Sequence, residues 1–148
     1  MNSPVRDLLE AKGRGVETVF QDVSVLDAVS KMEDKGIGCL LVTSKAGKVL
    51  GLISERDCVW KVVITEKSPH KTMVKDVMTP KRKLLVISPE KTVEECMAIM
   101  TSGRLRHLPV MEGDQLAGII SIGDVVKFML GDQQLTISQL EKYIGGSI

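Results

Sequence analysis

The stretch Gly51-Leu52-Ile53-Ser54-Glu55-Arg56-Asp57 occurs a second time as Gly118-Ile119-Ile120-Ser121-Ile122-Gly123-Asp124. In each copy an apolar, strand-like run ends in a serine, and an aspartate follows three residues later. The serine and the aspartate therefore stand where a helix would begin. Two such units in one small chain predict a duplicated fold with two pseudo-equivalent sites.

The repeat extends along most of the chain. Val5-Arg6-Asp7-Leu8-Leu9 corresponds to Val74-Lys75-Asp76-Val77-Met78, and Cys39-Leu40-Leu41-Val42 corresponds to His107-Leu108-Pro109-Val110. The spacing between matched segments drifts slightly, as loops of unequal length would cause. The period is longer than the roughly 20–50 residues of solenoid repeats. We therefore expect two copies packed face to face and not an open array.

Length, composition and charge limit the classes of function. The chain has 148 residues, of which 43% are hydrophobic and 26% are charged, as in an ordinary soluble domain. A net charge of +1 gives no electrostatic basis for binding nucleic acid or a membrane surface. Three scattered cysteines favour reduced thiols in the cytoplasm. Neither they nor the two histidines form the cluster that a metal site needs.

Hydrophobic periodicity and turn residues predict the elements of each copy. We expect helices near 4–12, 24–35, 55–64, 75–78, 92–103 and 122–130, and strands near 18–20, 39–42, 49–54, 107–111 and 115–121. An extended segment is expected at 84–87. Pro109 has no N–H group, so its strand should lie at an edge or be irregular. The predicted domains are 4–65 and 73–131, with a linker at 66–72 and an amphipathic helical tail at 132–148.

The element order and motifs together closely resemble the cystathionine-β-synthase (CBS) domain, here as a tandem pair, also called a Bateman module. The signals are the duplicated Gly-h-h-Ser-x-x-Asp motif (h, apolar), the run Asp76–Thr79 and the run Arg106–Val110. The resemblance covers roughly residues 4–131 and is greatest to short, stand-alone bacterial signal-transduction pairs. It implies an α+β fold of two pseudo-twofold-related β-α-β-β-α motifs packed sheet to sheet.

The resemblance also implies a function. Such modules bind adenosine nucleotides in the clefts between the two copies, with AMP as the favoured ligand and ATP, ADP, NAD or S-adenosylmethionine as alternatives. They are sensors and not enzymes, so no catalytic residue and no metal are expected. A homodimer through the CBS helices and an unidentified effector protein are the expected partners. The alternative is an interaction module that regulates a partner enzyme, for example a thioredoxin-linked one, without tight nucleotide binding.

Asp57 and Asp124 match the family position that holds the ribose. One carboxylate can accept hydrogen bonds from both neighbouring ribose hydroxyls. Each aspartate also stands in the first turn of a predicted helix, where an acidic residue stabilises the helix by itself. Ser54 and Ser121 have the same two interpretations, as donors to a ribose or phosphate oxygen and as caps of their own helices. Both roles can operate together.

The segments before the second strand of each copy complete the expected sites and make them unequal. Arg106 and His107 would supply cationic donors for a phosphate. Arg56 is the charged residue of the first junction, with a solvated surface arginine as the alternative. Phe20 could stack on a base, although a core phenylalanine is the favoured interpretation. The expected ligand-binding residues are Val19, Phe20, Ile37, Gly38, Cys39, Ser54, Arg56, Asp57, Arg106, His107, Pro109, Ser121 and Asp124.

Overall fold

The computed structural model describes residues 3–131, and these residues form two compact units. One unit is the continuous segment Gly15–Val86, and the other combines the described residues up to Arg14 with those from Ile87 onward. The units therefore do not follow the sequence repeat, because the opening helix of each copy is packed with the remainder of the other copy. The predicted amphipathic tail lies outside the described residues.

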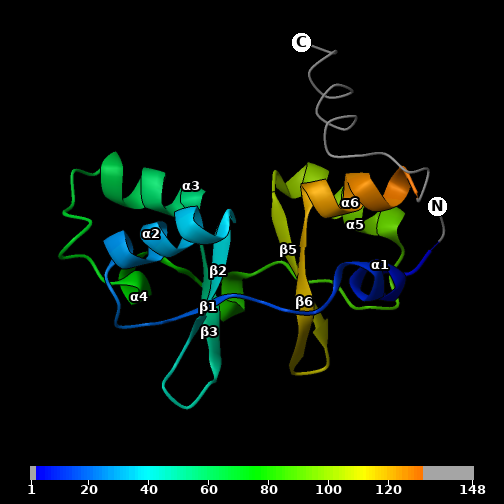
Figure 1. Ribbon diagram of the computed structural model, residues 1–148, viewed down its shortest axis with the longest axis horizontal. Coiled ribbons are helices and arrows are strands. Elements are labelled where there is room, and N and C mark those ends of the chain that lie inside the picture. The colour runs from blue at the N-terminus through cyan, green and yellow to red at the C-terminus, as the bar shows by residue number, and fades with distance from the viewer. Residues whose placement is uncertain (1–2, 132–148) are drawn as a thin grey trace, which may run out of the picture. The chain divides into compact units, whose positions relative to one another are not determined.

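The 15–86 unit is built on a four-stranded sheet in the order β1-β2-β3-β4 (Figure 1). β1 is parallel to β2, and the remaining neighbours are antiparallel. The helices α2 and α3 contact each other and the sheet. The strands are β1 (Thr18–Phe20), β2 (Cys39–Thr43), β3 (Val49–Ser54) and β4 (Thr79–Pro80). The helical elements are α2 (Val25–Lys35), α3 (Glu55–Cys58), the π-helical turn η1 (Val59–Val63), α4 (Val74–Val77) and the 3-10 turn η2 (Lys81–Lys83).

Local sequence explains the boundaries of these elements. The Ser24 hydroxyl accepts a hydrogen bond from the Asp27 N–H at 3.1 Å and begins α2. Gly36 ends the helix in the left-handed conformation, at φ 64°. The predicted helix at 55–64 is confirmed, but its second half is π-helical. All five residues of β2 are buried, as expected for a central strand whose two faces are both covered.

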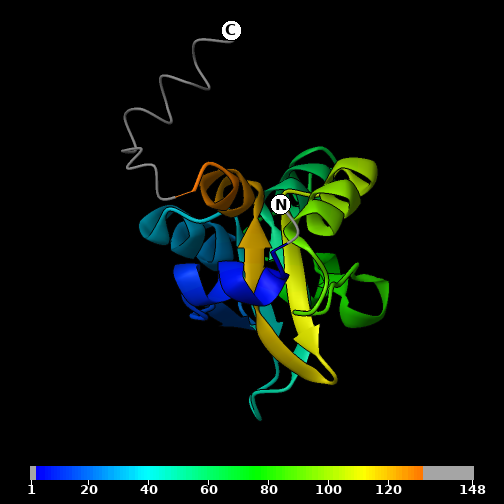
Figure 2. The same ribbon diagram turned by 90° about the vertical axis from the view of Figure 1, so that its right-hand side faces the viewer.

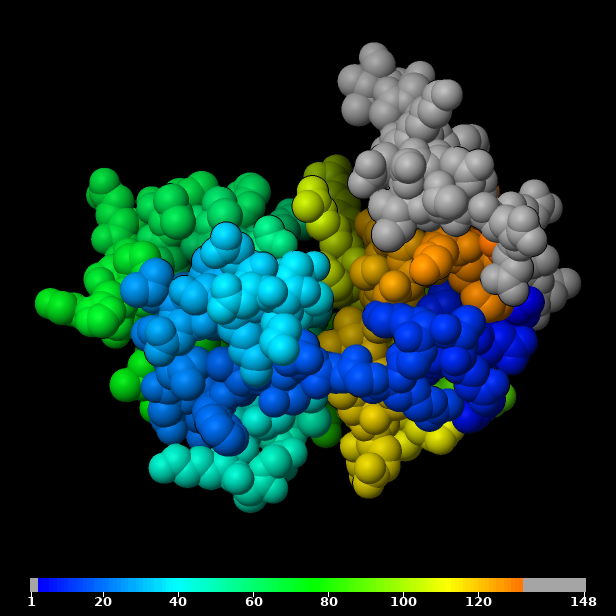
Figure 3. Space-filling view, in the orientation of Figure 1, coloured from blue at the N-terminus to red at the C-terminus, as the bar shows by residue number. Residues whose placement is uncertain are grey.

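The second unit carries the two-stranded antiparallel sheet of β5 (His107–Glu112) and β6 (Gln115–Ser121). Its helices are α1 (Val5–Lys12), α5 (Val93–Gly103) and α6 (Ile122–Met129). α1 lies against α6, and the two are adjacent in the space-filling view as well as in the ribbon (Figures 2 and 3). The register shifts between Val110 and Met111, next to Pro109, so the predicted irregularity is confirmed.

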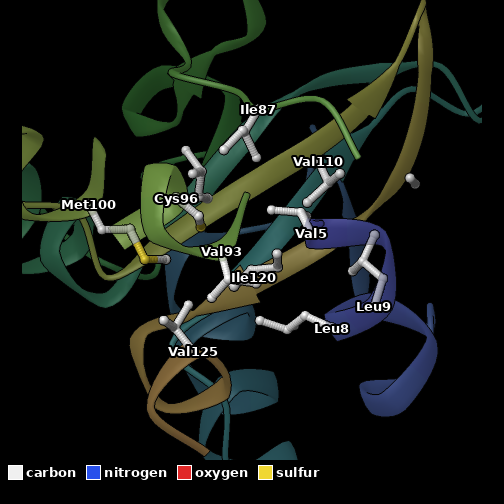
Figure 4. Packing of buried hydrophobic residues seen from close by; sticks show 12 residues of the cluster. Val5, Leu8, Leu9, Ile87, Val93, Cys96, Met100, Val110, Ile120 and Val125 are labelled. Atoms are coloured by element: carbon white, nitrogen blue, oxygen red, sulfur yellow. The ribbon is translucent and has the colours of Figure 1, made fainter. Parts of the chain in front are cut away.

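Each unit has its own apolar core. In the second unit, α1 brings Val5, Leu8 and Leu9 into a cluster formed mainly by residues of the second copy (Figure 4). In the 15–86 unit, α4 brings Val74 and Val77 into a cluster of the first copy. Burying three or two large side chains stabilises each attachment by several kcal/mol, at about 1.5–3 kcal/mol for each side chain.

Three details differ from the sequence-based expectations. α1 begins one residue later than predicted, because Pro4 is its N-cap and makes no side-chain capping bond. The segment expected to be extended at 84–87 is extended at Leu84 but pairs only at Ile87, which makes a parallel bridge to Val110. β4 was not predicted. It forms because Pro80 cannot continue a helix and disfavours helical backbone at Thr79, so these two residues pair with β3.

Candidate functional site

Both Ser-x-x-Asp motifs form complete capping boxes. The Ser54 hydroxyl accepts from the Asp57 N–H at 3.1 Å, and the Ser54 N–H donates to Asp57 Oδ2 at 3.0 Å. The equivalent bonds join Ser121 and Asp124 at 3.1 and 2.8 Å. The capping interpretation is therefore confirmed at both sites. A carboxylate has about four acceptor positions on two oxygens, so a cap leaves capacity for further hydrogen bonds.

The first strand of each hairpin holds the motif in place. Cys39 pairs with Ser54 across β2 and β3, and the Glu55 N–H donates to the Gly38 carbonyl at 3.0 Å. This arrangement brings Gly38 and Cys39 next to the start of α3. Asp57, two residues after Glu55, is thereby held close to the backbone of the first expected site.

The second unit repeats this geometry with different side chains. His107 pairs with Ser121 across β5 and β6, and the Ile122 N–H donates to the Arg106 carbonyl at 3.0 Å. The backbone of Arg106 and His107 therefore lies next to the start of α6. Arg106 is exposed and His107 is half-buried.

Asp57 is contacted through both of its carboxylate oxygens. Oδ2 accepts the capping bond from Ser54, whereas Oδ1 lies 3.0 Å from Lys61 Nζ and 3.4 Å from the Thr79 hydroxyl. Lys61 also donates to the Val77 carbonyl at 2.9 Å. The side chain of Asp57 is only 14% exposed. Lys61 and Thr79 thus surround the outer oxygen of this carboxylate.

Asp124 is contacted by a residue from the opening helix of the first copy. Lys12 Nζ lies 2.6 Å from Asp124 Oδ2, the oxygen that also accepts the Ser121 N–H. Lys12 donates in addition to the Ile119 carbonyl. Burial alone raises the pKa of Asp124, but the hydrogen bonds from Lys12 and Ser121 outweigh it and hold the pKa below its ordinary value. The carboxylate is therefore ionised at neutral pH.

The two sites differ because the opening helices differ in length. When Val5 is matched with Val74, the counterpart of Lys12 is Lys81. α1 continues to Lys12, whereas α4 ends at Val77 and the chain turns into β4 at Thr79 and Pro80. Thr79 consequently reaches Asp57, and Lys81 lies in η2 instead of at the end of a helix.

The other predicted residues are distributed as follows. Arg56 is exposed on α3, and its guanidinium carbon lies 5.6 Å from the centre of the Trp60 ring. Phe20 pairs with Thr43, at the end of β2 opposite Cys39. It is 54% exposed, so the favoured interpretation as a core phenylalanine is wrong. Pro109 is buried in the middle of β5, where it pairs with Ile119. Val19 and Ile37 pack against the core of the 15–86 unit.

Sequence reasoning missed Lys12, Lys61 and Thr79. Lys61 follows Asp57 by four residues on a predicted helix, which is the spacing of an ion pair and could have indicated it. Lys12 and Asp124 are separated by 112 positions, so no local pattern points to their contact.

The three cysteines are buried. Burial raises the pKa of Cys58 and of Cys96 to about 11, with a further contribution from Asp57 and Glu55 at Cys58. They are therefore neutral thiols at physiological pH. Within residues 3–131 no three or more His, Cys, Asp or Glu side chains are grouped so that they could hold a metal ion. No helix of this described part has the length and apolarity of a membrane span.

The CBS domain family model matches the chain twice, over residues 5–63 and 74–131. The chain belongs to the CBS domain family. The resemblance seen in the sequence and the α+β fold class are confirmed. A curated relative is the CBS domain-containing protein CBSX3, mitochondrial, of Arabidopsis thaliana. It is 32% identical over 151 residues, which cover 98% of this chain and 73% of that protein.

Solved structures of CBS proteins share this fold. A candidate signal-transduction protein with CBS domains from Burkholderia ambifaria MC40-6 is 43% identical, with a TM-score of 0.82, and the match covers 91% of this chain and 99% of that one. CBSX2, solved in complex with AMP, is 25% identical, with a TM-score of 0.69 and coverage of 86% and 96%. These relatives support a regulatory CBS pair.

Proposed function

We propose that this CBS pair is a ligand sensor that binds an adenosine nucleotide, with AMP as the first candidate, and that Asp57 and Asp124 accept hydrogen bonds from the ribose. The observation that carries the proposal is the duplicated junction: each aspartate is fixed by a capping box, and a lysine ammonium lies beside it. A fixed carboxylate next to cations suits a ligand that combines hydroxyl groups with phosphate. The AMP complex of CBSX2 supports the choice of ligand.

Arg106 and His107 would receive the phosphate in the second unit, because His107 pairs with Ser121 and Arg106 directly precedes it. Gly38 and Cys39 offer mainly backbone at the corresponding place in the first copy. Arg56 is the cation of that junction. Apolar contact with the ligand is proposed for the remaining residues, Val19, Phe20, Ile37 and Pro109. The two sites are therefore expected to bind with different affinities.

Calorimetric titration with AMP, ATP, NAD and S-adenosylmethionine tests the proposal, together with thermal unfolding. A ligand present at 100 times its Kd should stabilise the protein by about 2.7 kcal/mol. Asp57→Asn and Asp124→Asn, made separately, should each weaken binding at one site while the amide oxygen still accepts the hydrogen bond from the serine N–H. Unchanged binding in both variants would exclude the ribose role.

A second experiment addresses the phosphate. Arg106→Ala should weaken AMP far more than adenosine, because adenosine has no phosphate for the guanidinium to bind. Lys91→Ala, on an exposed residue in the same unit, is the matched control and should change neither affinity. Equal losses for AMP and adenosine in Arg106→Ala would indicate a structural role for Arg106.

An exposed apolar surface on η1 also supports a role in protein–protein interaction. Val59, Trp60 and Val63 of η1 and Ile64 at its end are between 47% and 64% exposed. Such an apolar surface is typical of an interface, and we propose that a second copy of the chain covers it. Trp60→Glu should then convert a dimer into a monomer in analytical ultracentrifugation. A monomeric wild-type protein would leave the surface to an effector protein.

A further inference from the structure

Lys12 lies beside Asp124, and its counterpart in the other copy, Lys81, does not occupy the equivalent place at the end of a helix. Lys12 belongs to α1 and therefore to the first copy, but it lies within the compact unit that contains Asp124. The side chains of Lys12 and Asp124 are 32% and 23% exposed, so the pair is accessible to a small molecule.

The Lys12 ammonium is held by two acceptors. One is the Ile119 carbonyl and the other is Asp124 Oδ2. An ammonium has three N–H donors, so these contacts leave capacity for one more hydrogen bond. The contacts of Asp124 with Lys12 and with the Ser121 N–H converge on Oδ2, which leaves acceptor capacity on the carboxylate. A donor and an acceptor of opposite charge thus lie side by side.

A vicinal diol matches this pair. One hydroxyl can donate to the carboxylate of Asp124 while the oxygen of the other accepts from Lys12. A phosphate in the same position would contact the Lys12 ammonium, but it would also lie against the Asp124 carboxylate. Two negative charges in contact repel each other. The pair therefore selects two neighbouring neutral hydroxyls.

The first aspartate lacks this arrangement. Lys61 and the Thr79 hydroxyl both approach Asp57 Oδ1, while Ser54 occupies Oδ2. Lys61 comes from the same helix as its aspartate and follows it by four residues. A diol at Asp57 would have to compete with the Thr79 hydroxyl for the outer oxygen.

We propose that Lys12 is a specificity-determining residue of the Asp124 site and that it donates a hydrogen bond to the second hydroxyl of the ribose. Lys12 and Asp124 together select ribonucleotides over 2′-deoxyribonucleotides. This inference rests on the proposed nucleotide binding at Asp124 and adds the residue and the sugar that the site distinguishes.

The test compares AMP with 2′-deoxy-AMP by calorimetric titration. The wild-type protein should prefer AMP by about tenfold or more, since the deoxy sugar leaves a hydrogen bond to a charged group unmade. Lys12→Met should reduce this preference several-fold, whereas Lys12→Arg, which keeps charge and donors, should retain most of it. Lys61→Met makes the same change beside Asp57 and should leave the preference of the Asp124 site unaltered.

The outcomes separate the two proposals. If Lys12 only holds α1 in place, Lys12→Met will weaken AMP and 2′-deoxy-AMP equally and the preference will persist, which overturns this inference alone. If the wild-type protein binds neither these two nucleotides nor ATP, NAD or S-adenosylmethionine, the proposed function fails and this inference fails with it. Should Lys12→Met not fold, loss of the preference in Lys12→Arg would overturn the inference as well.

Discussion

Gly51 and Gly118 occupy the same position in the two repeated motifs but meet different neighbours. A Cβ atom on Gly51 would lie 2.3 Å from the Thr79 carbonyl oxygen. A Cβ atom on Gly118 would lie 2.8 Å from a terminal methyl group of Leu9. A backbone carbonyl in a paired strand cannot move without displacing the strand, whereas a leucine side chain can change its rotamer.

We therefore predict that Gly51→Ala lowers the free energy of unfolding by about 2–3 kcal/mol and that Gly118→Ala lowers it by about 1 kcal/mol. Urea denaturation of the two variants measures both values, and the pair is matched because the same methyl group is added at equivalent positions. A smaller loss for Gly51→Ala than for Gly118→Ala would contradict the packing of β4 against β3.

Asp124 should contribute a pH-dependent part of the stability. Because its pKa in the folded protein is below the ordinary 3.8, the contribution is complete above the unfolded pKa and is lost as the pH falls through the folded pKa. Asp124→Asn should therefore flatten the fall of Tm on acidification from about pH 7 to about pH 3. Asp34→Asn, an exposed control with the same change of charge, should leave that fall unchanged.

The candidate site was predictable where it depends on neighbours in sequence. The serine-to-aspartate spacing predicted both caps, because a capping box is formed within four residues. Of the two cations beside the aspartates, only Lys61 has a spacing that a sequence could reveal. Lys12 reaches Asp124 only after the chain has folded. Thr79 contacts Asp57 because it lies in β4. A strand of two residues is too short to be predicted from the sequence.

At the level of elements, α2 and α5 end in the same left-handed conformation with different residues. Gly36 has a φ of 64° and Arg104 a φ of 52°. Glycine adopts this conformation without strain, whereas a residue with a Cβ atom is destabilised there by about 1–2 kcal/mol. The duplicated helices therefore differ in how well their ends are stabilised.

Exchanging these residue types should have opposite effects. Arg104→Gly is predicted to raise the free energy of unfolding by about 0.5–1 kcal/mol, and Gly36→Ala to lower it by about 1 kcal/mol. Thermal and urea unfolding of both variants provide the measurement. A neutral Gly36→Ala would show that α2 can end in another way.

Most helices and both hairpins were predictable because the periodicity of their apolar residues matches the face that is buried, and because turn residues mark their ends. Ser24 with Gly36, and Thr92 with Glu95, limit their helices by local chemistry alone. η1 was expected to be α-helical. The π-helical turn involves backbone bonds such as Ile64 N–H to the Val59 carbonyl at 3.0 Å, and no residue type specifies that choice.

In the whole molecule, the compact units and the sequence copies have different boundaries. The core of the 15–86 unit lies entirely between Val25 and Val77, so one continuous segment contains it. The other core needs Val5, Leu8 and Leu9 from the start of the chain as well as residues from Ile87 onward. A boundary placed between the copies would therefore divide both cores.

Fragments should reveal this difference. The segment 15–86 is predicted to unfold cooperatively on heating, as followed by circular dichroism, because it keeps its complete core. The segment 73–131 corresponds to the second sequence copy but lacks α1, and three buried side chains worth about 1.5–3 kcal/mol each are lost with it. It should show no cooperative transition. A stably folded 73–131 fragment would contradict the contribution of α1.

The attachment of α1 also sets an order of events on the ribosome. α1 is synthesised before residues 15–86, whereas most of the residues that cover Val5, Leu8 and Leu9 lie from Ile87 onward and leave the exit tunnel after residues 15–86. The middle of the chain can complete its own core meanwhile. α1 is thus secured only after the 15–86 unit has been synthesised, and its apolar face stays uncovered until β5 and β6 emerge.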